Sequence, residues 1–148
     1  MFGGVEVKNY MKKVLVFGTF DIFHEGHKDF LRQAREHGDF LRVIVARNAT
    51  VLKVKGRLPR FSEGERVNVI KKSGLADEVF PGSLDDRYGV LRDFKPDVVC
   101  LGYDQSQSIP ELRRKLDELG LYRTKIIRLN PYEPEKYKSS ILRKALDS

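Results

Sequence analysis

The chain of 148 residues is long enough for one domain with a sizeable hydrophobic core, and its 41% hydrophobic and 33% charged residues are typical of a folded globular protein rather than a disordered one. No stretch approaches the roughly 20 apolar residues that span a bilayer, and the first residues lack the apolar region of a signal peptide. We therefore expect a cytoplasmic protein with no membrane partner. The formal net charge of +7 favours anionic partners without choosing among them.

The only cysteine, Cys100, lies in the apolar run 97–102. A single cysteine cannot form an intrachain disulfide, and this one has no second cysteine at metal-binding spacing. We expect it to be a small buried hydrophobic residue.

The first half of the chain alternates short apolar runs with helical patterns. Residues 1–11 are expected to form a short extension before a domain that spans 12–148. In chain order the patterns predict a strand at 12–18, a helix at 27–38 that ends at Gly38, a second strand at 39–47 and a basic loop at 53–60, which Gly56 and Pro59 interrupt.

The second half repeats this alternation. Ser62 and Glu65 match a capping box, which predicts a helix that starts there and ends near Gly74. The remaining predictions are a strand at 76–82, a helix at 88–94, a strand at 97–102, a helix at 108–120, a strand at 124–129 and a C-terminal helix at 140–148.

Strands that alternate with helices at this spacing predict an α/β fold, a single doubly wound Rossmann-like domain with helices on both faces of a parallel sheet. The usual order of five such strands is 3-2-1-4-5, which places strands one and four side by side. Ligands bind beyond the carboxyl ends of the strands at this position. The polar ends "GTFD" of strand one and "GYDQ" of strand four are therefore expected to face one crevice.

The stretch "GTFDIFHEGH" at 18–27 allows three interpretations. A zinc site would need three or four ligands and a different histidine spacing from that of His24 and His27. A polar turn, capped for example by Asp21, does not account for two histidines and Gly26 at a helix start. Phosphate binding accounts for the histidines and the glycines together. Gly18 and Gly26 allow close backbone approach, the helix start attracts anions, and imidazoles donate hydrogen bonds to phosphate oxygens.

"GTFDIFHEGH" resembles the signature of the nucleotidyltransferase superfamily that includes cytidylyltransferases, phosphopantetheine adenylyltransferases and archaeal FAD synthases. The similarity continues through "VARNATVLKVKGR", "SEGERVNVI", "LGYDQ" and "KSSIL", and the first and third of these segments look most like archaeal FAD synthases. The resemblance implies an enzyme that transfers a nucleoside monophosphate from ATP or CTP to a phosphorylated acceptor and releases pyrophosphate. ATP and FMN, which would give FAD, are the favoured pair.

The resemblance also implies roles for individual residues. His24 and His27 match the pair that binds the triphosphate and stabilises the transition state, and Lys53 matches a phosphate-contacting lysine in the basic loop, with Lys55 as the alternative. Arg66 matches the arginine of the "ER" helix, as a ligand contact or in a structural ion pair. The positions expected to contact the nucleotide are Gly18, Thr19, Phe20, His24, Glu25, Gly26, His27, Asp104, Tyr132, Ser139 and Ser140.

Three of these positions have a second interpretation. Asp104 is expected to accept hydrogen bonds from ribose or base, or to cap a turn. Tyr132 is expected to pack on the nucleotide or in the core. Ser139 and Ser140 are expected to meet the β- and γ-phosphates, to cap the last helix, or both.

Triphosphate chemistry implies Mg²⁺, held mainly by phosphates and water, and we assign it no protein ligand. Homodimerisation is expected from the resemblance. Glycerol 3-phosphate cytidylyltransferases and heptose-type sugar-phosphate nucleotidyltransferases are the alternatives within the class, although "KYKSSIL" departs from the closing motif of the former. No nucleic-acid-binding motif appears, and a nucleotide sensor without catalysis is disfavoured because both histidines are present.

Overall fold

The computed structural model describes residues 11–105 and 109–132. Its strands are β1 (Lys13–Gly18), β2 (Phe40–Val45), β3 (Glu78–Pro81), β4 (Val98–Leu101) and β5 (Lys125–Arg128). Its helices are α1 (Glu25–Arg35), α2 (Asn48–Lys55), α3 (Glu63–Ser73), α4 (Gly89–Phe94) and α5 (Ile109–Glu118). None of these helices has both the length and the apolar character that crossing a bilayer requires.

The five strands form one parallel sheet in the order β3-β2-β1-β4-β5, which confirms the predicted topology. The register aligns Gly18 at the end of β1 with Val45 at the end of β2, and Val16 with Cys100 in β4. The carboxyl ends of the three central strands therefore lie at one edge of the sheet.

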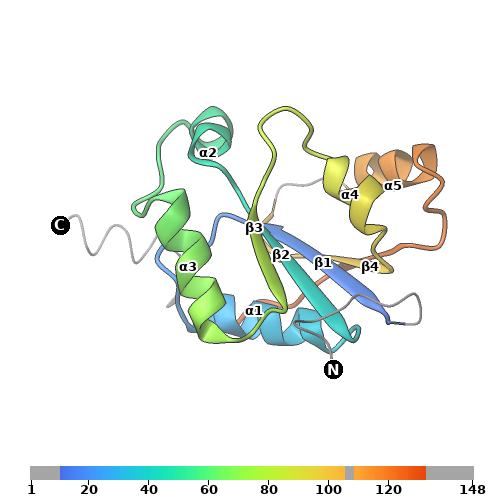
Figure 1. Ribbon diagram of the computed structural model, residues 1–148, viewed down its shortest axis with the longest axis horizontal. Helices are drawn as coiled ribbons and strands as arrows, with labels where there is room; N and C mark the ends of the chain where they lie inside the picture. The colour runs from blue at the N-terminus through green and yellow to red at the C-terminus, as the bar shows by residue number, and fades with distance from the viewer. Residues whose placement is uncertain (1–10, 106–108, 133–148) are drawn as a thin grey trace, which may run out of the picture.

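Each face of the sheet packs against its own pair of helices (Figure 1). Successive residues of β1 point to opposite faces of the sheet, so Val14 and Val16 belong to one hydrophobic cluster and Leu15 to the other. The face of Val14 packs against α1 and α3, whereas the face of Leu15 packs against α4 and α5. Strands covered on both sides explain the nearly continuous apolar runs in the sequence.

Local signals fix several helix ends. Ser62 and Glu65 form the predicted capping box at the start of α3, with Glu65 N donating to Ser62 Oγ at 3.1 Å. Gly74 ends α3 in the left-handed conformation at φ 72°. Lys95 ends α4 in the same conformation at φ 52°, without the freedom of glycine.

The prediction for the segment after β2 was incomplete. A loop was expected over 53–60, but Lys53 and Lys55 belong to α2, which Gly56 ends. The sequence does not predict this helix because the helix has neither a periodic apolar face nor a capping side chain: Val51 is its only buried residue, and no side chain caps its start. Cys100 is buried as predicted, and burial raises its pKa to about 12.

Candidate active site

A cavity of about 430 Å³ lies beyond the carboxyl ends of the strands, between α2 and the segments that follow β1, β4 and β5. The predicted site residues that line it are Gly18, Thr19, Phe20, His24, Gly26, His27, Lys55, Asp104 and Tyr132. The polar ends of strands one and four therefore face one crevice, as expected.

The turn between β1 and α1 is strained. Phe20 and Ile22 have φ values of 53° and 51°, in the left-handed region that bulky side chains rarely adopt. Gly18 makes this turn possible, because a Cβ there would lie 2.6 Å from the Phe20 ring. Backbone strain of this kind persists only where surrounding contacts hold it, and it concentrates at functional sites.

The two histidines form a capping box at the start of α1. His24 is the N-cap residue, and its Nδ1 accepts a hydrogen bond from Gly26 N at 3.0 Å. His27 Nδ1 accepts from His24 N at 3.3 Å, and the two rings stack with their centroids 3.8 Å apart. Capping therefore explains the spacing of the histidines better than the sequence suggested, and it occupies the Gly26 N–H that was expected to face a ligand.

These hydrogen bonds assign the protonation of both rings. Because each Nδ1 is an acceptor, the proton of each neutral imidazole is on Nε2. Burial, together with the smaller effects of the neighbouring His24 and Lys55, lowers the pKa of His27 to about 3. Burial also lowers the pKa of His24, against the opposing effects of Asp104 and Glu25. Both imidazoles are thus neutral Nε2–H donors at neutral pH.

Aromatic rings hold His27 in place. The ring of Phe20 meets it edge-on with centroids 5.5 Å apart, and the ring of Phe23 stacks on it at 5.7 Å. Phe20 is only 4% exposed, so its ring supports the histidine from the core while still lining the cavity.

Only one of the two candidate lysines lines the cavity. Lys55 lines the cavity and its Nζ donates to Thr19 Oγ1 at 3.2 Å. Lys53, the favoured candidate in the sequence, does not line the cavity. The two residues point in different directions because positions two apart on a helix lie on different faces.

Arg66 and Glu25 also lie outside the cavity lining. Arg66 is 1% exposed and donates hydrogen bonds to backbone carbonyls. Its hydrogen-bond acceptors are uncharged, so they differ from the structural ion pair that was one interpretation of Arg66. Glu25 is exposed and pairs with Lys28 at 3.1 Å.

The segment after β4 contributes Asp104 and Gln105 to the cavity. The turn is capped by Gln105, whose Oε1 accepts from Gly102 N at 2.7 Å and whose Nε2 donates to Phe17 O. The carboxylate of Asp104 has no hydrogen-bond partner within residues 11–105 and 109–132. Turn capping therefore does not explain Asp104.

Tyr132, which follows β5, is 41% exposed and lines the cavity, so it does not belong to the core. Ser139 and Ser140 lie outside the described residues, as does the C-terminal helix predicted at 140–148.

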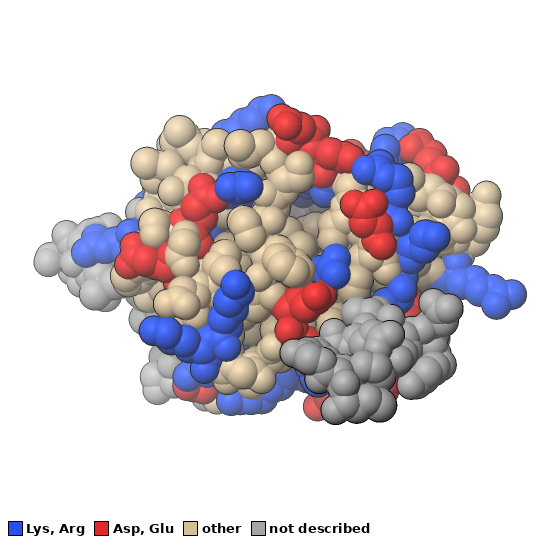
Figure 2. Space-filling view, in the orientation of Figure 1, with Lys and Arg blue, Asp and Glu red and all other residues tan. Residues whose placement is uncertain are grey.

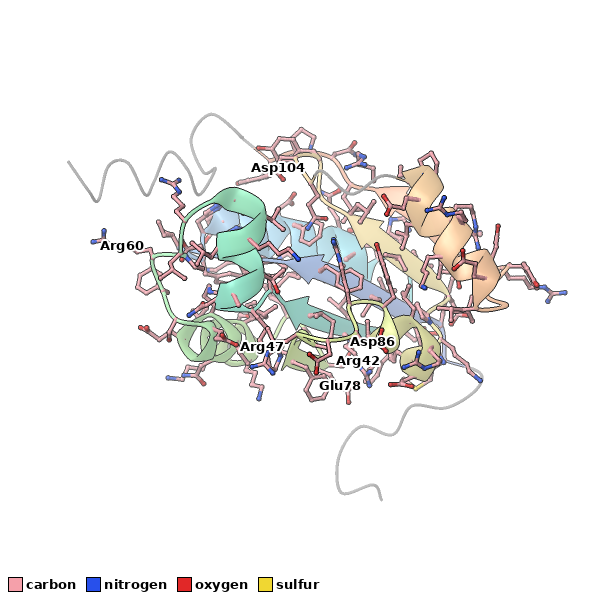
Figure 3. All side chains as sticks on the ribbon, turned by 90° about the horizontal axis from the view of Figure 1, so that it is seen from above. Arg42, Arg47, Arg60, Glu78, Asp86 and Asp104 are labelled. Atoms are coloured by element: carbon pink, nitrogen blue, oxygen red, sulfur yellow. The ribbon has the colours of Figure 1, made fainter. Side chains whose placement is uncertain are left out.

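Arg47 is a cavity residue that the sequence reasoning missed. It follows β2, and its Nε donates to Gly82 O at 2.7 Å while Nη1 pairs with Glu63 at 3.1 Å. The rule applied to the ends of strands one and four would have found it at the end of strand two. Figure 3 shows Arg47 and Asp104 well apart, in the segments that follow β2 and β4.

The acidic side chains near the site do not gather into a metal-binding cluster. Among the residues that the structure describes, no three histidine, cysteine or acidic side chains are placed to hold a metal ion. Asp21, the example of a capping residue in the polar-turn interpretation, accepts hydrogen bonds from the backbone of Arg60 at 2.7 Å and Phe61 at 3.0 Å.

Comparisons with known proteins agree with this geometry. The chain is 36% identical to a FAD synthase of Thermoplasma acidophilum over 92% of this chain and 94% of that protein. It is 44% identical to a FAD synthase of Pyrococcus horikoshii over 81% of this chain and 80% of that protein.

Solved structures share the fold. A Thermoplasma volcanium structure described as a lipopolysaccharide core biosynthesis protein superimposes with a TM-score of 0.77 and 36% identity, over 83% of this chain and 99% of that one. A pantoate-beta-alanine ligase from Francisella tularensis, at 16% identity and a TM-score of 0.62, covers 95% of this chain and 71% of that chain and shares the fold alone. The model of the cytidylyltransferase-like family matches residues 15–145, and the chain accordingly belongs to the cytidylyltransferase-like family of nucleotidyltransferases.

Proposed function

We propose that this nucleotidyltransferase is an FMN adenylyltransferase, which makes FAD and pyrophosphate from ATP and FMN. The observation that carries the proposal is the stacked pair of His24 and His27, whose Nδ1 atoms are both engaged by the backbone. Each ring is therefore held with its proton on Nε2, and an imidazole N–H is a suitable donor for a phosphate oxygen. The names of the similar archaeal proteins support FMN as the acceptor.

In the proposed reaction a phosphate oxygen of FMN attacks the α-phosphorus of ATP in line. The bond from that phosphorus to the bridging oxygen breaks, and pyrophosphate leaves with the electron pair. Negative charge on the transferring group is met by the imidazole donors and by Lys55, so the chain contributes mainly positioning and electrostatic stabilisation.

Two other cavity residues suit the ribose and the base of a bound nucleotide. The carboxylate of Asp104 suits ribose hydroxyls, which are hydrogen-bond donors, and the exposed ring of Tyr132 suits stacking on a base. Ser139 and Ser140 remain predicted contacts of the β- and γ-phosphates.

Mg²⁺ is part of the proposal. The donor set of the cavity fits an ion that is held by the triphosphate and water, because the nearest buried carboxylate, Asp21, already accepts two backbone hydrogen bonds. When bound, the ion would neutralise charge on the phosphates. The domain limits at 12–148, the cytoplasmic location and the homodimer remain predictions.

The deciding experiment measures pyrophosphate release with Mg²⁺, with ATP and CTP each crossed against FMN, glycerol 3-phosphate and sugar phosphates. We expect turnover with ATP and FMN. Turnover with CTP alone, or with a sugar phosphate alone, would contradict the flavin assignment. The sugar-phosphate arm is included because the Thermoplasma volcanium structure carries the name of a lipopolysaccharide core biosynthesis protein.

The choice between the lysines has its own test. Lys55→Ala should lower kcat/KM by at least about tenfold through the loss of a charge next to the phosphates. Lys53→Ala removes the same charge from the same helix outside the cavity and should leave kcat/KM nearly unchanged. Equal losses in the two variants would indicate a general effect of the basic helix.

A further inference from the structure

We propose that Arg66 is a positioning residue, which holds the strained turn after β1 and the helix α2 around the reacting phosphates without touching them. This inference rests on the proposed function for its kinetic test. Arg66 is among the largest fully buried side chains described, at 1% exposure, and it belongs to α3 rather than to the cavity wall.

The guanidinium joins the segments that build the site. Nη1 donates to Thr19 O at 2.9 Å and to Ala46 O at 2.8 Å, which ties the residues just after β1 and β2 to one group. Nη2 donates to Asn48 Oδ1 at 2.7 Å, at the first residue of α2. Nε donates to Phe61 O at 3.1 Å, in the segment that follows α2.

These bonds matter because α2 has little apolar anchorage, although Glu63 of α3 also accepts from Asn48 N at 3.2 Å. Its only buried residue is Val51, and Leu52 and Val54 are 47% and 63% exposed. The helix nevertheless carries Lys55, whose amine reaches Thr19 Oγ1. Arg66 thus holds Thr19 from the carbonyl side and fixes α2 at its first residue.

Asp21 completes the arrangement from the other side. The peptide N–H of Phe61 donates to Asp21 while the carbonyl of Phe61 accepts from Arg66. The segment after α2 is therefore held by one group from the strained turn and one from α3. Burial lowers the pKa of Arg66, and the nearby carboxylates of Asp21 and Glu63 oppose this effect.

Lysine cannot replace this group. A guanidinium presents five N–H donors in a planar fork, whereas an ammonium presents a compact charge with three. Arg66→Lys keeps the charge but cannot reach Thr19, Asn48 and Phe61 together. Because a displacement of about 1 Å can cost about 10² in rate, we expect kcat to fall about ten- to a hundredfold with the KM for both substrates within about threefold of wild type.

Arg113 provides a matched control. Its guanidinium also donates to two backbone carbonyls, those of Leu121 and Thr124, but it lies on α5 and does not line the cavity. Arg113→Lys should reduce thermal stability with kcat within about twofold of wild type. An equal kcat loss in both lysine variants would overturn the proposal, because ordinary destabilisation would then explain it.

Asn48→Ala provides a gentler variant if substitution of Arg66 prevents folding. It deletes only the bond from Nη2 to α2, and we expect a smaller kcat loss in the same direction. Arg66→Ala adds a chemical test, because guanidinium ions at concentrations far below those that unfold proteins should restore part of kcat while urea should not. A kcat of Asn48→Ala equal to wild type, or rescue that urea reproduces, would contradict the positioning role.

Hydrogen exchange separates this inference from the proposed function. If wild type turns over no substrate pair, the proposed function fails, but faster exchange confined to α2 and to 19–22 in Arg66→Lys would still support positioning. Uniformly faster exchange across the sheet would overturn it.

Discussion

At the scale of single residues, the same side chains serve folding and the proposed chemistry. His24 and His27 cap α1 through Nδ1 and keep a proton on Nε2. Alanine at either position would remove both functions at once. Variants that separate the two are therefore needed to assign a rate effect to the donor.

Asparagine provides this separation. In His24→Asn and His27→Asn the side-chain oxygen can accept the backbone hydrogen bond at the former place of Nδ1, whereas the Nε2–H donor is lost. We expect kcat to fall by about 10²–10³, as for the alanine variants, with thermal stability close to wild type, measured by pyrophosphate release and thermal unfolding. Full activity in both asparagine variants would remove the histidines from the mechanism.

The protonation of His27 predicts a pH dependence of stability. Its pKa of about 3 in the folded protein lies below the ordinary 6.5, so the unfolded chain binds the proton first as the pH falls. Stability is fully present above pH 6.5 and is lost toward pH 3, by about 2 kcal/mol between pH 7 and pH 5. Urea unfolding of wild type and His27→Asn at both pH values measures this difference. A loss of equal size in the variant would show that His27 is not the source.

At the scale of elements, α2 carries Lys55 to the cavity although it buries a single residue. Val51 is its only buried residue, and Gly56 ends it at φ 79° immediately after Lys55. The end of this helix therefore bears directly on the position of the lysine.

Two glycine variants test this dependence. Gly56→Ala and Gly74→Ala place a side chain at φ 79° and 72°, with no atom within 4 Å of the new Cβ in either case. Each should lose about 1 kcal/mol of unfolding free energy through backbone strain alone. Only Gly56→Ala should also lower kcat/KM, because Lys55 precedes it. If Gly74→Ala lowers kcat/KM equally, α2 has no special role.

At the scale of the whole molecule, the sheet order brings the ends of β1, β2 and β4 to one cavity, and the chain as a whole carries a formal net charge of +7. Figure 2 shows Lys and Arg interspersed with Asp and Glu on the face in view rather than gathered in one stripe. This distribution is unlike the basic stripe of a protein that follows a nucleic-acid backbone.

Ligand binding should therefore stabilise the fold selectively. ATP with Mg²⁺, or FMN, at about 100 times its Kd should add roughly 3 kcal/mol to the free energy of unfolding. Duplex DNA at low salt should add little. Thermal unfolding with each ligand measures this, and a larger shift with DNA than with ATP would favour the nucleic-acid alternative.

The order of strands and helices was predictable because local patterns encode it. Apolar runs such as 12–18, the capping box of Ser62 and the stop at Gly74 are signals within a few residues of the element that they fix. The histidine motif was also visible, since its members lie within one turn and the helix that follows.

The placement and contacts of Lys55, Arg66 and Gln105 were decided only by the tertiary structure. The cavity wall takes Lys55 rather than Lys53 because of the rotation at which α2 is anchored through Val51. Arg66 binds carbonyls that are 47 and 20 residues away in the chain, and no local pattern records such distances. The sequence by itself determined the fold and the kind of chemistry, because both follow from short-range signals. Which side chains hold the site together depended on contacts that exist only once the strands are side by side.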